Sequence, residues 1–150
     1  MLSAVEAVEC VIGIRTGKAP VLSVQQLVNC ATFSPILRGC EGGLPGLALT
    51  YVKLKGLVEE STYPYKGVYG RCDYDINANR PGKIRNWYGV LPSETHFMEV
   101  LQKYGPMPIA IDASKWKTYK KGGCRTCRLY LTFFQVLSNA AAGLDLVTTP

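Results

Sequence analysis

The hydrophobic pattern changes once along this chain, and the change restricts the folds that the chain can adopt. Near the N-terminus apolar residues recur at helical spacing, as at Val5, Val8 and Ile12, whereas after Pro81 the spacing suits strands. A helical first half followed by a sheet-forming second half is typical of the α+β class. We place the boundary between the two halves near residues 80–85.

Three helices are predicted in the first half, over residues 3–15, 24–30 and 47–56. Glycines at positions 17 and 56 should end the first and the third of them. Ser23, followed three residues later by Gln26, forms a capping-box pattern at the start of the second. The segment 59–81 is rich in Tyr, Pro, Gly and Asn, so it is predicted to be an ordered loop.

The second half is predicted to contain two strands and one helix. Residues 83–90 suit a strand, Ser93 caps a short helix that runs to Lys103, and residues 108–113 form a β-rich run. The Tyr-Gly-Pro sequence at residues 104–106 should break the helix.

The composition indicates a globular chain with a moderate positive charge. Of its 150 residues 47% are apolar and 19% are charged, and the net charge is +6. The densest basic group, between residues 115 and 128, could attract an anionic surface or simply form a solvated loop, and no nucleic-acid motif accompanies it. No apolar run is long enough to span a bilayer, and the N-terminus lacks the basic start of a secretory signal. We therefore expect neither a nucleic-acid partner nor a membrane partner.

Six cysteines, at positions 10, 30, 40, 72, 124 and 127, indicate an oxidising compartment in which disulfides persist. Cys124 and Cys127 form a CxxC pair, which is either redox-active or an incidental feature of the C-terminal segment. A zinc site would need two further ligands, and the sequence has no second CxxC pair and no histidine nearby. We predict no metal site and no cofactor.

Five segments carry motifs in a suggestive order: residues 3–9 (SAVEAVE), 22–30 (LSVQQLVNC), 39–43 (GCEGG), 63–72 (YPY followed by GRC) and 104–113 (YGPMPIAIDA). In this order and spacing they resemble the papain family of cysteine peptidases. The resemblance implies a papain-like two-domain fold of the α+β class, with the active site between the domains. It implies a helical left half at residues 1–82, an incomplete β-barrel right half at residues 83–127, and a divergent tail at residues 128–150.

The same resemblance implies one disulfide, between Cys30 and Cys72. Cys40 would pair in the family with a cysteine upstream of the nucleophile, and this sequence has none there. The pairing of Cys10, Cys124 and Cys127 stays open.

The resemblance also assigns part of a peptide-binding cleft. Gly42 and Gly43 would line the edge along which a peptide runs as an extended strand, because glycine allows a second backbone to approach closely. Leu44, Pro45 and Ala110 would wall the apolar pocket for the side chain two residues before the scissile bond. Gly42 and Gly43 could equally serve only to form the turn before the next helix, and the two interpretations are compatible.

No residue of this sequence matches the family's catalytic groups. The nucleophile would align two positions before Met1, and nothing after about Cys127 resembles the strand that carries the catalytic histidine. The one histidine, His96, falls in a predicted surface helix and is expected to be solvated or locally bonded. We expect the sheet half to have unpaired edges and the chain alone to be marginally stable.

Three hypotheses for function follow. The first is a fragment, truncated at both ends, of a lysosomal or secreted peptidase whose parent hydrolyses peptide bonds with a Cys–His pair, the fragment itself being inactive. The second is a non-catalytic pseudopeptidase that binds a peptide or protein partner. The third is a redox or interaction module built on the tail.

Overall fold

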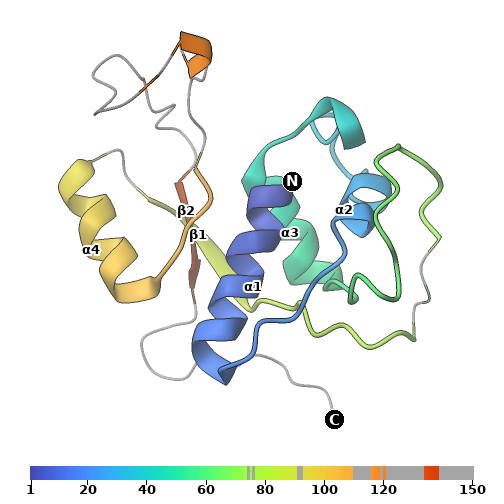
Figure 1. Ribbon diagram of the computed structural model, residues 1–150, viewed down its shortest axis with the longest axis horizontal. Helices are drawn as coiled ribbons and strands as arrows, with labels where there is room; N and C mark the ends of the chain where they lie inside the picture. Colours follow the sequence, from blue (N-terminus) through green and yellow to red (C-terminus); the bar gives the residue numbers. More distant parts are fainter. Residues whose placement is uncertain are drawn as a thin grey trace.

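The computed structural model describes residues 1–73, 75, 77–90, 93–109, 116–118, 120 and 134–138. Its elements in chain order are α1 (Leu2–Thr16), α2 (Val24–Cys30), the 3₁₀ turn η1 (Gly39–Glu41), α3 (Pro45–Lys55), β1 (Asn86–Val90), α4 (Glu94–Tyr104), the 3₁₀ turn η2 (Trp116–Thr118) and β2 (Phe134–Ser138). In Figure 1, α1 and α3 lie together at the centre, α2 lies on one side of them, and β1, β2 and α4 lie on the other.

The four predicted helices are confirmed, and their ends follow from local backbone chemistry. Gly17, in the left-handed conformation at φ 74°, ends α1, and Gly56, at φ 73°, ends α3. Glycine adopts positive φ without the steric cost of a Cβ. Ser93 caps α4 by accepting a hydrogen bond from the backbone N–H of His96. None of the helices in the described residues is both long and apolar enough to cross a membrane.

Only half of the predicted capping box at α2 is present. Ser23 Oγ accepts a hydrogen bond from the Gln26 N–H at 3.0 Å, as expected. The Gln26 side chain does not reach back to Ser23, because it accepts from the Val58 N–H at 2.8 Å and donates to the Gly56 carbonyl at 3.1 Å. The N–H of Ser23 donates to the Val58 carbonyl instead. The prediction of a reciprocal box is therefore wrong, since a tertiary partner replaced the local one.

The larger hydrophobic core lies between α1, α2 and α3. Its fully buried side chains include Val5, Val8, Leu27, Leu49 and Val52. Burial of each such side chain contributes about 1.5–3 kcal/mol. The core includes Val5, Val8 and Ile12, whose spacing predicted the first helix.

A smaller core forms beyond α3, and one strand joins it to the first. Val90 and Val100 are its buried members, and Phe97, Tyr104 and Met107 pack against them. At the other end of β1, Trp87 packs on the larger core and its Nε1–H donates to Thr50 Oγ1 at 3.2 Å. β1 therefore contacts both cores: Val90 belongs to the smaller one, and Trp87 packs on the larger one beside α3.

The tail contributes a strand that the sequence did not predict. β2 pairs antiparallel with β1, in a register that runs from Asn86 opposite Ser138 to Val90 opposite Phe134. The apolar run at this position is short, and periodicity alone does not distinguish a short buried strand from other structure. This pairing covers one edge of β1, and the expectation that the sheet half has unpaired edges stays a prediction.

The remaining strand predictions are only partly met. β1 begins at Asn86 rather than at Lys83, since its pairing with β2 extends no further than Asn86 opposite Ser138. Pro108 and Ile109 have no regular secondary structure, and residues 110–113 lie outside the described residues. The division at residue 82 stays a prediction.

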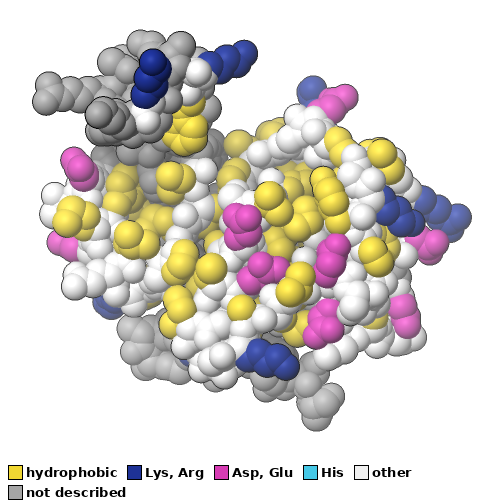
Figure 2. Space-filling model, in the orientation of Figure 1, with side chains coloured by type: hydrophobic (Ala, Val, Ile, Leu, Met, Phe, Trp, Pro, Cys, Tyr) yellow, Lys and Arg dark blue, Asp and Glu magenta, His cyan; other side chains and the backbone are white. Residues whose placement is uncertain are grey.

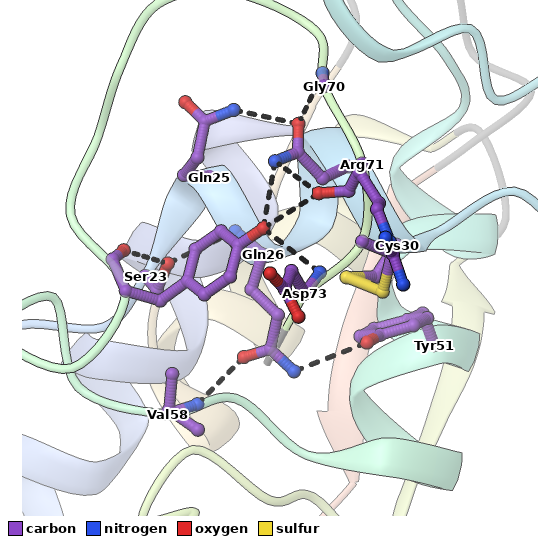
Figure 3. Close-up of a disulfide and its surroundings, with 12 residues drawn as sticks. Ser23, Gln25, Gln26, Cys30, Tyr51, Val58, Gly70, Arg71 and Asp73 are labelled. Carbon is purple, nitrogen blue, oxygen red and sulfur yellow. Dashed lines mark hydrogen bonds between the residues drawn. A yellow bond between two sulfur atoms is a disulfide. The ribbon is translucent and has the colours of Figure 1, made fainter. Parts of the chain in front are cut away.

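The predicted loop at 59–81 is ordered without helices or strands at its described positions. Backbone bridges between Leu22 and Glu59 and between Leu57 and Gly82 hold its two ends. The Cys30–Cys72 disulfide ties it to α2, with a Cα–Cα distance of 4.8 Å (Figure 3).

We expect Cys72→Ser to lower the free energy of unfolding by about 4 kcal/mol in the chain-entropy treatment, because the bond closes a loop with a sequence separation of 42. Urea titration measures this loss. Cys40→Ser is the matched control, since Cys40 is an exposed free thiol, and should change stability by less than about 0.5 kcal/mol. Equal effects of the two substitutions would show that the disulfide does not stabilise the fold.

Candidate functional site

The predicted cleft edge is built on a tight turn, residues 38–45, which we call the glycine turn. Leu37, buried in the larger core, anchors its start. The Arg38 N–H donates to the Gly42 carbonyl at 3.0 Å, and the Gly42 N–H donates to the Gly39 carbonyl at 3.4 Å. These bonds close the turn around η1 and leave Gly42 and Gly43 exposed.

Gly42 and Gly43 are required for different reasons. Gly42 has φ 106° and ψ −164°, a conformation that side chains disfavour, and a Cβ there would meet nothing within 4 Å. A Cβ on Gly43 would lie only 2.7 Å from Leu37 Cδ2. The backbone conformation at Gly42 and the contact with Leu37 at Gly43 both favour glycine, and the open space beside Gly42 allows another backbone to approach.

Leu44 and Pro45 begin α3 directly after the glycine turn. The carbonyl of Leu44 accepts from the Leu47 N–H at 3.1 Å and the Ala48 N–H at 3.2 Å, while Pro45 occupies the first helical position. Both side chains are half-buried, so each leaves part of its apolar surface uncovered. Ala110, the remaining predicted pocket residue, lies outside the described residues.

A surface pocket of about 350 Å³ adjoins the glycine turn. It is lined by Leu37, Arg38, Cys40, Glu41 and Tyr69. Tyr69 comes from the loop after α3, and sequence analysis did not assign it to the site. The one available signal was its place between the Tyr-Pro-Tyr and Gly-Arg-Cys motifs.

The charges beside this pocket contribute little to stability. Arg38 Nη1 lies 3.9 Å from Glu41 Oε2, and both side chains are mostly exposed, so solvent screens the pair.

Cys40 is an exposed free thiol whose Sγ lies 4.0 Å from the Gly67 carbonyl oxygen. Within the described residues Cys10, on α1, is the other free cysteine and is also exposed.

His96 is a surface residue in the first turn of α4, as predicted. Its Nδ1 lies 3.8 Å from Glu99 Oε2 on the same helix. In the part of the chain that the structure describes, no group of three or more His, Cys, Asp and Glu side chains could hold a metal ion.

Burial lowers the pKa of the Met1 α-amino group, at the start of α1.

Comparisons with known proteins agree on one family. The family model of the papain family cysteine proteases matches residues 1–133. The match extends six residues beyond Cys127, the point where the resemblance in sequence motifs ended. Cathepsin S of Bos taurus is 38% identical over 125 residues, which are 80% of this chain and 37% of that protein. The chain therefore spans little more than a third of that curated relative.

Solved structures of similar fold come from an insect and a plant. The digestive procathepsin L 3 of the Tenebrio molitor larval midgut superposes with a TM-score of 0.72 and 26% identity, over 89% of this chain and 45% of that one. Bromelain from Ananas comosus, solved with the inhibitor E64, gives a TM-score of 0.69 and 29% identity, over 81% and 55% of the two chains. The α+β papain-like fold is thus confirmed over part of its length.

We expect Gly39→Ala to destabilise the glycine turn by about 1–3 kcal/mol, because Gly39 has φ 56° and a Cβ there would lie 2.5 Å from Tyr69 Cδ2. Gly70→Ala is the control, since its Cβ would meet only Asn29 Nδ2, at 3.8 Å. Urea titration of both variants checks the difference, and equal losses would contradict the steric requirement for glycine at position 39.

Proposed function

Because the chain belongs to the papain family of cysteine proteases, we propose that it serves peptide-bond hydrolysis as the substrate-binding helical half of such a protease. The glycine turn is the observation that carries the proposal. It combines two exposed glycines, one at positive φ, with two half-buried apolar residues at the start of α3.

The bound peptide lies extended along Gly42 and Gly43. Hydrogen bonds between the two main chains give affinity in this mode, and adjacent apolar walls give specificity. Leu44, Pro45 and Ala110 supply the wall for one apolar side chain of the peptide. In Figure 2 hydrophobic side chains are exposed on both the α1–α3 side and the β1–α4 side of the face in view, with acidic side chains among them.

We assign no catalytic role to a residue of this chain. Thiol proteolysis needs a cysteine thiolate with a histidine within hydrogen-bond reach. His96 lies on α4 beside Glu99, and the exposed thiols Cys10 and Cys40 lie on α1 and η1. Residues 1–150 are therefore proposed to bind peptide without cleaving it, and hydrolysis needs catalytic groups beyond these. The alternative is a pseudopeptidase that binds a peptide or protein partner and takes no part in hydrolysis. The same placement of His96 favours it.

The substrate is a peptide or protein, and the compartment is oxidising, lysosomal or extracellular. The Cys30–Cys72 disulfide supports this assignment, because reducing compartments do not maintain such bonds.

Leu44→Asn tests the binding mode. Asparagine is a favourable N-cap, and Leu44 occupies the N-cap of α3 without a side-chain hydrogen bond, so the fold should lose little stability. Loss of the apolar wall should weaken binding of the capped peptide acetyl-Ala-Leu-Leu-Ala-amide by about tenfold, the equivalent of 1.4 kcal/mol. Amide chemical-shift titration of the labelled chain measures the affinity.

Leu54→Asn, at an exposed site near the opposite end of α3, is the control and should leave affinity unchanged. Saturable shifts at Gly42 and Gly43 without cleavage products support binding without turnover. Failure of the peptide to bind the unaltered chain would reject the proposal. Labelling of the native protein from its source by a thiol-directed inhibitor, at a cysteine outside residues 1–150, would favour the protease over the binding-only alternative.

A further inference from the structure

Residues 65–73 form a segment, here called the strap, that crosses between α2 and the glycine turn. One side of it borders a pocket of about 250 Å³, lined by Asn29 of α2, by Tyr63 and by residues of the strap. On its other side, Tyr69 lines the pocket of about 350 Å³ beside the glycine turn. The strap has no helix or strand at these positions, so its backbone polar groups bond to side chains or to water instead of to a regular ladder.

One buried side chain of α2, that of Gln25, supplies most of those partners at the start of the strap, and Figure 3 shows where it lies. Gln25 is fully buried, and its Oε1 accepts from the N–H groups of Lys66 at 2.8 Å and Gly67 at 3.2 Å. Its Nε2 donates to the Val68 carbonyl at 2.8 Å and to Asn29 Oδ1 at 2.8 Å. All the hydrogen-bonding capacity of this amide is used, and three of its four bonds go to the strap.

Asn29 continues the same attachment one helical turn later. Its Oδ1 accepts from the Gly70 N–H at 3.0 Å, and its Nδ2 donates to the Arg71 carbonyl at 3.3 Å and to the Tyr63 hydroxyl at 2.9 Å. The bond from Gln25 Nε2 fixes the orientation of the Asn29 amide, so the second attachment depends on the first.

The strap in turn contacts the glycine turn. The Tyr69 ring lies directly against Gly39, so closely that a Cβ on Gly39 would be 2.5 Å from Cδ2 and 3.2 Å from Cε2. The carbonyl of Gly39 accepts the hydrogen bond from the Gly42 N–H. The position of the Tyr69 ring therefore limits where the backbone of the turn can lie.

We propose that Gln25 is a positioning residue for peptide binding: it holds the strap so that Tyr69 supports Gly39 and the turn presents Gly42 and Gly43. The consequence for binding rests on the proposed function, whereas the effect on the turn does not.

The neighbouring residue provides a matched control. Gln26 is as deeply buried as Gln25, but its side chain bonds to Val58, Gly56 and Tyr51 and not to the strap. Gln25→Met and Gln26→Met each remove a buried amide from adjacent positions of one helix. The two variants differ in the segment that loses its hydrogen bonds: the strap in Gln25→Met, and residues 56–58 in Gln26→Met.

The test measures amide hydrogen exchange in the full chain, at Arg38, Glu41 and Gly42, whose N–H groups bond within the turn. Gln25→Met should speed exchange there at least tenfold more than it speeds exchange in α1, which reports global opening. Gln26→Met should change the turn and α1 by the same factor. Gln25→Met should also weaken peptide binding at least fivefold at concentrations where the chain is folded.

Tyr69 supplies a second test that does not depend on folding of the glutamine variants. Its side chain is exposed, so Tyr69→Ala should leave the fold intact but speed exchange in the turn, and Tyr69→Phe, which keeps the ring, should not. Equal turn exchange in Gln25→Met and Gln26→Met, or normal turn exchange in Tyr69→Ala, overturns the proposal. If the unaltered chain binds no peptide, the proposed function fails while the exchange data still decide whether Gln25 positions the turn.

Discussion

The structure depends on a set of buried amides on α2. Gln25, Gln26 and Asn29 sit inside the molecule next to the apolar core, and every amide among them is hydrogen-bonded. A buried amide left without a hydrogen-bond partner costs about 1–3 kcal/mol. A buried amide is therefore tolerated only where it is hydrogen-bonded. Here most of the partners are backbone groups of segments that have no regular structure, and the others are tyrosine hydroxyls and the bond between Gln25 and Asn29.

This arrangement explains how a short helix organises a long loop. α2 has seven residues, too few to be stable by helix propensity alone. Its apolar side, with Leu27, packs into the core, while its amides bond to residues 56–58 and to the strap. The Cys30–Cys72 bond adds a covalent connection at the end of the same helix. Helix, loop and glycine turn therefore form one connected unit, and the surface proposed for peptide binding lies at its edge.

The second half of the chain is attached differently. It joins the first through α3 and β1, where Trp87 bonds to Thr50 and Lys53 Nζ donates to Asn86 Oδ1 at 3.1 Å. Its own core is small, centred on Val90 and Val100. The strand of the tail completes a two-stranded sheet with β1, so this half too relies on a partner distant in sequence.

The sequence by itself determined what depends on neighbouring residues. Helical spacing located α1 and α3, the Ser93 cap located α4, and glycines marked their ends. The Gly42–Pro45 part of the proposed site came from a motif of consecutive residues, which a sequence shows directly. Only the tertiary structure decided the rest: that Gln26 bonds to Val58 instead of completing a local cap, that β2 pairs with β1, and that Tyr69 packs on Gly39. The physical reason is that a side chain or a short apolar strand can satisfy several alternative partners at similar free energy. The partner that such a group finally bonds to is set by the distant segment that core packing brings close to it.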